Sequence, residues 1–270
     1  MLILRIKTWL CVRLNYRIYR LISNIVFWLN FEDEINQRQR EILSERIYRN
    51  YSGEIAFGIF KGLKINLGSA WSGARDTGSK ILGLYENQIL KWIESRTFDL
   101  FIDIGAADGY YALGLLHSKR ATRAVTFEIS EKDRGLISEA SIKLNLLENI
   151  EILGRANEEQ IIDAFGKYKK VLILMDIEGE EFTLITSTLL EAARNCHFLI
   201  EMHDKSNGFH EKNLIELCKK THATEILEGN ERIFPTDTYL TTLTDNQKSL
   251  LTSEGRQYSM KWLALSPQVD

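Results

Sequence analysis

Apolar and polar positions follow two alternating periods along most of the chain, and this pattern predicts an α/β fold. From residue 98 onward, short apolar runs typical of buried strands are followed by segments with helical periodicity. The predicted strands are 100–104, 123–129, 149–153, 170–176, 196–202, 223–227 and 260–265. The predicted helices are 110–117, 131–144, 158–165, 180–194 and 210–220. This alternation predicts a mostly parallel sheet with helices on both faces, and the long excursion before the last strand predicts that this strand returns antiparallel.

The part of the chain before residue 98 has a different character. Residues 54–67 read as a short hairpin, and residues 82–94 read as an amphipathic helix that leads into the first strand. Between them, residues 68–79 form a Gly/Ser-rich loop that we place over the ligand mouth. We therefore divide the chain into a helical extension (1–50), a lead-in segment (51–97) and an α/β domain (98–270).

A second polar stretch, residues 232–259, interrupts the α/β alternation near the end of the chain. It carries Thr and Asp without strong periodicity. Two interpretations stay open for it: a loop on the substrate side of the sheet, or an ordinary surface insertion.

The first 30 residues combine apolar side chains with basic ones and contain no acidic residue. The basic residues are Arg5, Lys7, Arg13, Arg17 and Arg20. They interrupt the run of ~18 apolar residues that a spanning helix needs, and no small-residue cleavage site follows. We expect either peripheral contact with the inner face of a membrane or a helix docked on protein, in a cytoplasmic chain.

Composition narrows the function. Of 270 residues, 44% are hydrophobic, which is enough for a sizeable core. The net charge of −3 provides no global positive field for a nucleic acid, so a small-molecule or glycan acceptor fits better. The three scattered cysteines, with no CxxC pair, indicate a reducing compartment without disulfides or structural zinc.

The most informative segment is 98–111, which reads Phe-Asp-Leu-Phe-Ile-Asp-Ile-Gly-Ala-Ala-Asp-Gly-Tyr-Tyr. A buried strand here enters a loop with Gly105 and Gly109 and then a helix, the joint at which α/β proteins hold nucleotide-like ligands. Asp103 and Asp108 are expected at the lip of this crevice. Because carboxylates disfavour phosphate and favour a cation, the loop suits S-adenosylmethionine, which has an ammonium and a sulfonium group.

Acidic residues also stand at the ends of three later strands. Glu128 lies about 20 residues after Gly105, the spacing at which an acid on the second strand reaches ribose hydroxyls. Asp176 follows the fourth strand, and Glu201 and His203 end the fifth on one face. We expect His203 to act as a general base, because an unperturbed imidazole titrates near pH 6.5.

A metal-dependent alternative uses the same edge of the sheet. Asp176, Glu201, His203 and Asp204 would then hold a hard divalent ion that acidifies a substrate hydroxyl. Glu178 and Glu180 are expected to favour the positive N-terminus of the following helix.

Together these motifs resemble the FkbM-type class I S-adenosylmethionine-dependent methyltransferases. The resembling segments are 83–86 (Gly-Leu-Tyr-Glu), 101–111, 127–128 (Phe-Glu), 175–181 (Met-Asp-Ile-Glu-Gly-Glu-Glu) and 200–203 (Ile-Glu-Met-His). The resemblance covers about residues 58–203, with a plausible further strand at 261–263, and it does not include the basic N-terminus. It implies a seven-stranded, mostly parallel Rossmann-like methyltransferase sheet and O-methylation of a sugar or secondary-metabolite hydroxyl.

We expect His203, Asp176 and Glu201 to form the catalytic group. The expected cofactor-binding residues are Glu86, Asp103, Gly105, Ala106, Ala107, Asp108, Gly109, Tyr110, Glu128, Asn157 and Asp176. Family members usually have Gly-Ala-Asn where this chain has Gly105, Ala106 and Ala107. One polar contact to the cofactor is therefore absent, or Asp108 supplies it.

Three other functions remain as alternatives to the O-methyltransferase that the resemblance implies. A nucleic-acid methylase would carry an Asn/Asp-Pro-Pro-Tyr-like segment where Met-Asp-Ile-Glu-Gly stands. A nucleotide-linked dehydrogenase would use the same strand and loop, but Asp103 and Asp108 disfavour it. An inactive adapter of a membrane-associated glycan-assembly complex would keep the fold and dock through its N-terminal helix.

Overall fold

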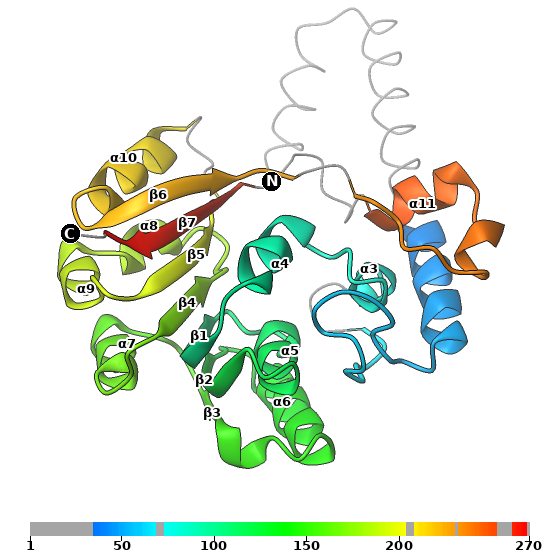
Figure 1. The fold of residues 1–270 in the computed structure, drawn as a ribbon, viewed down its shortest axis with the longest axis horizontal. Helices are drawn as coiled ribbons and strands as arrows, with labels where there is room; N and C mark the ends of the chain where they lie inside the picture. Colours follow the sequence, from blue (N-terminus) through cyan, green and yellow to red (C-terminus); the bar gives the residue numbers. More distant parts are fainter. Residues whose placement is uncertain (1–34, 69–72, 204–207, 230–231, 253–260, 269–270) are drawn as a thin grey trace, which may run out of the picture.

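Seven strands form one sheet in the part of the chain that the computed structural model describes, residues 35–68, 73–203, 208–229, 232–252 and 261–268 (Figure 1). The strands lie in the order β3-β2-β1-β4-β5-β7-β6. Their bounds are β1 Phe98–Ile104, β2 Ala121–Phe127, β3 Ile150–Leu153, β4 Val171–Met175, β5 His197–Glu201, β6 His222–Leu227 and β7 Trp262–Pro267. All pairs are parallel except those that β7 makes with β5 and β6. The predicted seven-stranded, mostly parallel Rossmann-like sheet and its reversed last strand are confirmed.

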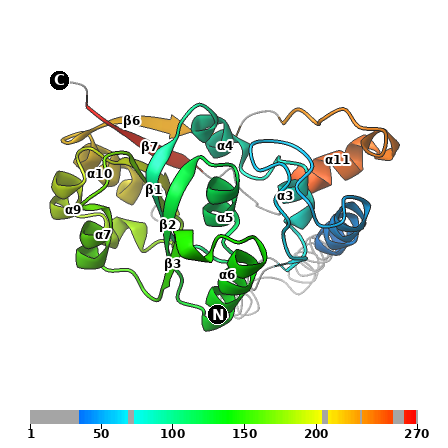
Figure 2. The ribbon, with the colours of Figure 1, turned by 60° about the horizontal axis from the view of Figure 1, so that its bottom comes forward.

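Helices cover both faces of the sheet, as predicted (Figure 2). On one face lie α4 (Asn87–Glu94), α5 (Tyr110–His117) and α6 (Glu131–Lys143). On the other lie α7 (Glu158–Phe165), α9 (Ser187–Ala192) and α10 (Phe209–Cys218). Successive strand residues alternate between these two apolar layers, so every position of β4 is buried, and this explains the uninterrupted apolar runs in the sequence.

A third apolar cluster lies beside the sheet and joins segments that are distant in the sequence. It contains Leu43 and Ile47 from a helix over 35–50, Ile81 from α3 (Thr77–Ile81) and Leu251 from α11 (Asp245–Thr252). Figure 1 shows these elements together at one side of the sheet. Buried Ser44 fixes the 35–50 helix to the next segment, because its hydroxyl donates to the Arg75 carbonyl (2.9 Å) and accepts from the Gly78 N–H (3.1 Å). We call this unit, residues 35–94 with 232–252, the cap.

Three expected elements differ from the structure. The helix predicted over 180–194 is two short helices, α8 (Glu181–Leu184) and α9, because Ile185 is extended. The hydroxyl of Thr186 accepts the Leu189 N–H at 3.0 Å and starts the second helix anew. The hairpin predicted over 54–67 is reduced to one isolated bridge between Glu54 and Lys64.

The third difference is the helix predicted over 82–94, which begins only at Asn87. Gly83 (φ +66°) and Glu86 (φ +44°) are both in the left-handed region and separate α4 from α3. The polar segment 232–259 also contains two helical elements that its sequence did not predict, the 3₁₀ turn Leu240–Thr242 and α11. The predicted N-terminal helix over 1–30 lies outside the described residues.

No helix within the described ranges is long and apolar enough to cross a membrane.

Gly105 allows the ends of β1 and β4 to approach closely. Its φ is +90°, and a Cβ there would lie 1.9 Å from the Asp176 carbonyl oxygen. We expect Gly105→Ala to lower the free energy of unfolding by about 3 kcal/mol or more, through the clash and the unfavourable φ. Urea unfolding measures this.

Gly135→Ala is the matched control for this substitution. Gly135 lies inside α6, and a Cβ there would meet nothing within 4 Å. Alanine should therefore stabilise the helix by roughly 0.5–1 kcal/mol. Equal effects of the two alanines would contradict the close approach at Gly105.

Candidate active site

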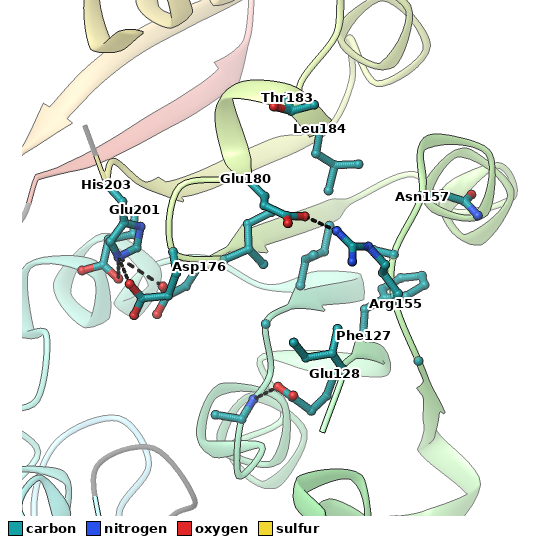
Figure 3. Close-up of a pocket in the computed structure, with 18 of the residues that line it drawn as sticks. Phe127, Glu128, Arg155, Asn157, Asp176, Glu180, Thr183, Leu184, Glu201 and His203 are labelled. Atoms are coloured by element: carbon teal, nitrogen blue, oxygen red, sulfur yellow. Dashed lines mark hydrogen bonds and ion pairs between the residues drawn. The ribbon is translucent and has the colours of Figure 1, made fainter. Parts of the chain in front are cut away.

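A cavity of about 780 Å³ opens at the carboxyl ends of the central strands (Figure 3). This is the edge of an open α/β sheet at which ligands bind. The glycine loop and β2 supply one side with Gly105, Ala107 and Glu128, and the ends of β4 and β5 supply another with Asp176 and His203. The cap closes a further side with Arg40, Arg75, Asp76, Lys80 and Tyr85. The volume is within the usual range for a small-molecule site, about 300–1,000 Å³.

Glu128 holds the glycine loop in place from the neighbouring strand. Its Oε2 accepts the Ala107 N–H at 2.8 Å, and its Oε1 accepts the Ser130 N–H at 2.7 Å. The carboxylate is buried in the cavity wall, and each oxygen keeps a second lone pair. Ala107 itself has φ +46°, in the region that favours Gly or Asn. The loop therefore depends on Glu128 for part of its shape.

The two carboxylates of the glycine loop do not line the cavity, contrary to expectation. Asp103 is 1% exposed, and neither of its carboxylate oxygens has a hydrogen-bond partner among the described residues. Burial, assisted by the charge of Asp176, raises the pKa of Asp103 to about 8, so it is mostly protonated at neutral pH. Asp108 is paired with Lys80. The electrostatic reason for preferring a cationic ligand at this loop is thus weakened.

Lys80 connects the cap to the glycine loop. Its Nζ lies 3.1 and 3.2 Å from the two carboxylate oxygens of Asp108, and it sits 5.3 and 5.0 Å from the ring centres of Tyr85 and Tyr110. Both partners are mostly buried. Sequence reasoning missed this pair, because two residues 28 positions apart carry no local signal of their contact.

The remaining predicted cofactor residues divide between the cavity wall and the layer behind it. Asn157 lines the wall, and its side-chain oxygen caps α7 by accepting the Gln160 N–H at 2.9 Å. Glu86 accepts a hydrogen bond from the Tyr111 hydroxyl and is buried. Glu86, Ala106, Gly109 and Tyr110 do not line the cavity. Their direct contact with a cofactor stays a prediction.

The catalytic group predicted from the sequence is brought together. In Figure 3 the side chains of Asp176, Glu201 and His203 point toward one another. His203 Nε2 lies 3.6 Å from Asp176 Oδ1 and 3.6 Å from Glu201 Oε2. The predicted neighbours from β4 and β5 are therefore adjacent, whereas Asp204 lies outside the described residues.

Two further acids surround the same ring, and sequence reasoning did not assign them this position. Glu178 Oε2 lies 3.9 Å from His203 Nε2, and Glu181 Oε1 is hydrogen-bonded to Nδ1. Glu181 is fully buried, whereas Glu178 and Glu180 are largely exposed. Among the three acids at 178, 180 and 181, Glu181 differs by its burial, which the sequence does not reveal.

The acids set the protonation of His203. Burial by itself lowers the pKa of the imidazole, but the hydrogen bond that Nδ1 donates to Glu181 and the charges of Asp176, Glu181 and Glu178 outweigh it. The pKa therefore lies above its ordinary value of 6.5. A larger fraction of the ring is protonated at neutral pH, which reduces its capacity as a general base, and the base assignment stays a prediction.

Comparison with known proteins gives likenesses to solved structures only. A search against protein-family models found no match, and a search of curated proteins found none. Streptococcus pneumoniae Sp1610, described as a putative tRNA (m1A22) methyltransferase, is 14% identical over 67% of this chain and 71% of its own, with a TM-score of 0.41. M. capricolum TrmK, solved with S-adenosyl-homocysteine, is 13% identical over 66% of this chain and 67% of its own, with a TM-score of 0.41. WbdD, solved with a kinase inhibitor, is 20% identical over 73% and 42%, with a TM-score of 0.44.

We expect the bond between Lys80 and Asp108 to contribute strongly to stability. Lys80→Met should lower the free energy of unfolding by about 3 kcal/mol, because it leaves the Asp108 carboxylate buried without its cation. Lys80→Met combined with Asp108→Leu should recover part of this loss, and a double-mutant cycle in urea measures the coupling.

Lys143→Met is the control, since Lys143 pairs with Glu139 on the surface of α6. It should cost less than about 1 kcal/mol. Additive effects of the two substitutions at Lys80 and Asp108 would show that the pair does not tie the cap to the loop.

Proposed function

We propose that the protein is an S-adenosylmethionine-dependent O-methyltransferase of the FkbM type, acting on a hydroxyl of a glycan or other small molecule. The observation that carries the proposal is one cavity lined by Glu128 after β2 and by Asp176, Glu201 and His203 after β4 and β5. A carboxylate suited to ribose hydroxyls and a group suited to a reacting hydroxyl thus share one space. The cavity has room for a nucleoside-sized cofactor beside a small acceptor.

The residues present fit this cofactor. Glu128 has lone pairs left for ribose hydroxyls after binding the loop amides. Phe127, Ile129 and Ile177 give the same wall apolar surface for a purine ring. The cofactor would supply a methyl group that its sulfonium makes electrophilic. The protein must then hold a hydroxyl in line with that methyl group and accept its proton.

Asp176, Glu201 and His203 are proposed for those two tasks. Alignment of the reacting groups contributes up to roughly 7–11 kcal/mol to lowering the barrier, and a general base about 10²- to 10⁴-fold in rate. Asp176 and Glu201 would hold the acceptor hydroxyl in line with the methyl group that the cofactor would supply, and His203 would accept the hydroxyl proton. Because the pKa of His203 is raised, the transfer should favour pH values above neutral.

The acceptor class rests on charge and on the shape of the site. The chain carries a net charge of −3, which gives no general attraction for a polyanion. The cavity is enclosed by the cap on one side, which suits a single sugar or small molecule better than a duplex. We propose a role in cell-envelope polysaccharide biosynthesis, with residues 1–30 as a peripheral membrane contact.

Cofactor binding tests the proposal directly. Calorimetry should show binding of S-adenosylmethionine and its demethylated product, and no binding of NAD. Glu128→Ala should weaken S-adenosylmethionine by at least about 100-fold, since two hydrogen bonds to a carboxylate contribute roughly 1.5–3 kcal/mol each. Glu139→Gln on the exposed face of α6 is the control and should leave affinity unchanged.

The outcomes of this calorimetry separate the alternatives. NAD binding without S-adenosylmethionine binding would indicate a dehydrogenase. Binding of neither NAD nor S-adenosylmethionine would leave the inactive adapter as the remaining interpretation. Normal affinity in folded Glu128→Ala would contradict the ribose assignment.

The acceptor and the role of His203 are tested together. Labelled S-adenosylmethionine should transfer its methyl group to cell-envelope sugar fractions and not to tRNA. His203→Ala should lower the rate by about 10²- to 10⁴-fold, while the dissociation constant of S-adenosylmethionine stays within about two-fold. Activity that is insensitive to this substitution would remove His203 as the base.

A further inference from the structure

His203 is oriented as a metal-binding histidine is, with one ring nitrogen fixed and the other directed into the cavity. Buried Glu181 accepts from Nδ1, so that in the neutral ring the lone pair is on Nε2. The His203 side chain is 10% exposed, and among the described residues Nε2 makes no hydrogen bond. A carboxylate behind a metal-bound imidazole is the usual arrangement, because it raises the basicity of the ligand.

The spacing of the groups around Nε2 suits an ion between them. Asp176 Oδ1 lies 3.6 Å away and Glu178 Oε2 3.9 Å away, beyond the roughly 2.7–3.2 Å of a hydrogen bond. Two ligands that share an ion at about 2.1 Å lie roughly 3.0–3.4 Å apart, so small side-chain shifts would close the set. The ligand atoms of Asp176, Glu178 and His203 all lie within 4.8 Å of one another.

The local charge also favours a cation. Four carboxylates surround one imidazole: Asp176, Glu178, Glu181 and Glu201. A protonated ring offsets one of these negative charges, and two of the carboxylates, those of Glu181 and Glu201, are almost completely buried. A divalent ion would reduce the repulsion among the carboxylates by more than a proton does.

We propose that Asp176, Glu178 and His203 bind one divalent first-row ion, with Mn²⁺ the best match to two carboxylates and one imidazole. Imidazole makes the set less suited to Ca²⁺ or Mg²⁺, which take oxygen ligands. The positions that the protein leaves open face the cavity. This inference rests on the proposed function for its purpose. With the ion bound, an acceptor hydroxyl on it would lose its proton to water more easily and His203 would serve as a ligand, so the role of His203 as the base belongs to the protein without the ion.

Electron paramagnetic resonance of the full chain, stripped with EDTA and titrated with MnCl₂ in the absence of S-adenosylmethionine, tests the site. One Mn²⁺ should bind per chain, with ¹⁴N modulation from an imidazole ligand. Asp176→Asn and His203→Gln should each weaken Mn²⁺ by at least about ten-fold, and His203→Gln should abolish the nitrogen signal. Glu181→Gln should weaken it about 10- to 100-fold through the orientation of the ring.

Glu180→Gln is the matched control, because Glu180 belongs to the same acidic run but pairs with Arg155 at 2.5 Å. It should leave Mn²⁺ affinity within about two-fold. No bound Mn²⁺, or binding that Asp176→Asn and His203→Gln leave intact, would overturn the site. If His203→Gln fails to fold by circular dichroism, Asp176→Asn and the nitrogen signal of the wild type decide.

Cofactor calorimetry in EDTA separates this inference from the proposed function. Mn²⁺ binding without any S-adenosylmethionine binding would keep the ion site and overturn the methyltransferase. S-adenosylmethionine binding without Mn²⁺ binding would keep the methyltransferase and overturn the ion site.

Discussion

The contact between the backbone of Gly105 and the carbonyl of Asp176 determines the geometry on which the site depends. With no side chain at residue 105, the loop after β1 passes directly beside the end of β4. The glycine loop and the acidic group therefore form two walls of the same cavity. Glu128 then holds the loop from the β2 side through the Ala107 amide. The absence of a Cβ at Gly105 thus allows residues at the ends of β1, β2 and β4 to line one cavity.

The sequence predicted the sheet well because its signal is local. Apolar runs of strand length, separated by helical periodicity, report burial directly, and the acids and the histidine at strand ends follow from strand direction. The features that the sequence could not predict depend on partners that are distant in the sequence, or on burial. The burial of Asp103, the bond from Lys80 to Asp108 and the position of Glu181 behind His203 are all of this kind. The break at Ile185 was missed because a Thr hydroxyl can cap a helix as easily as it can stand inside one.

The cap and the sheet contribute different chemistry to the cavity. The sheet edge supplies carboxylates and an imidazole, whereas the cap supplies guanidinium groups from Arg40 and Arg75 together with Lys80. Part of the cap packs in its own apolar cluster, whereas Phe60, Leu63 and α4 pack in the layer on one face of the sheet.

The apolar cluster of the cap has a consequence for the order of events during synthesis. Leu43 and Ile47 precede the sheet in the chain, whereas Leu240, Leu243 and Leu251, which pack in the same cluster, follow six of its seven strands. Nearly the whole sheet is translated in between. The 35–50 helix therefore completes its apolar packing only after most of the sheet has been translated.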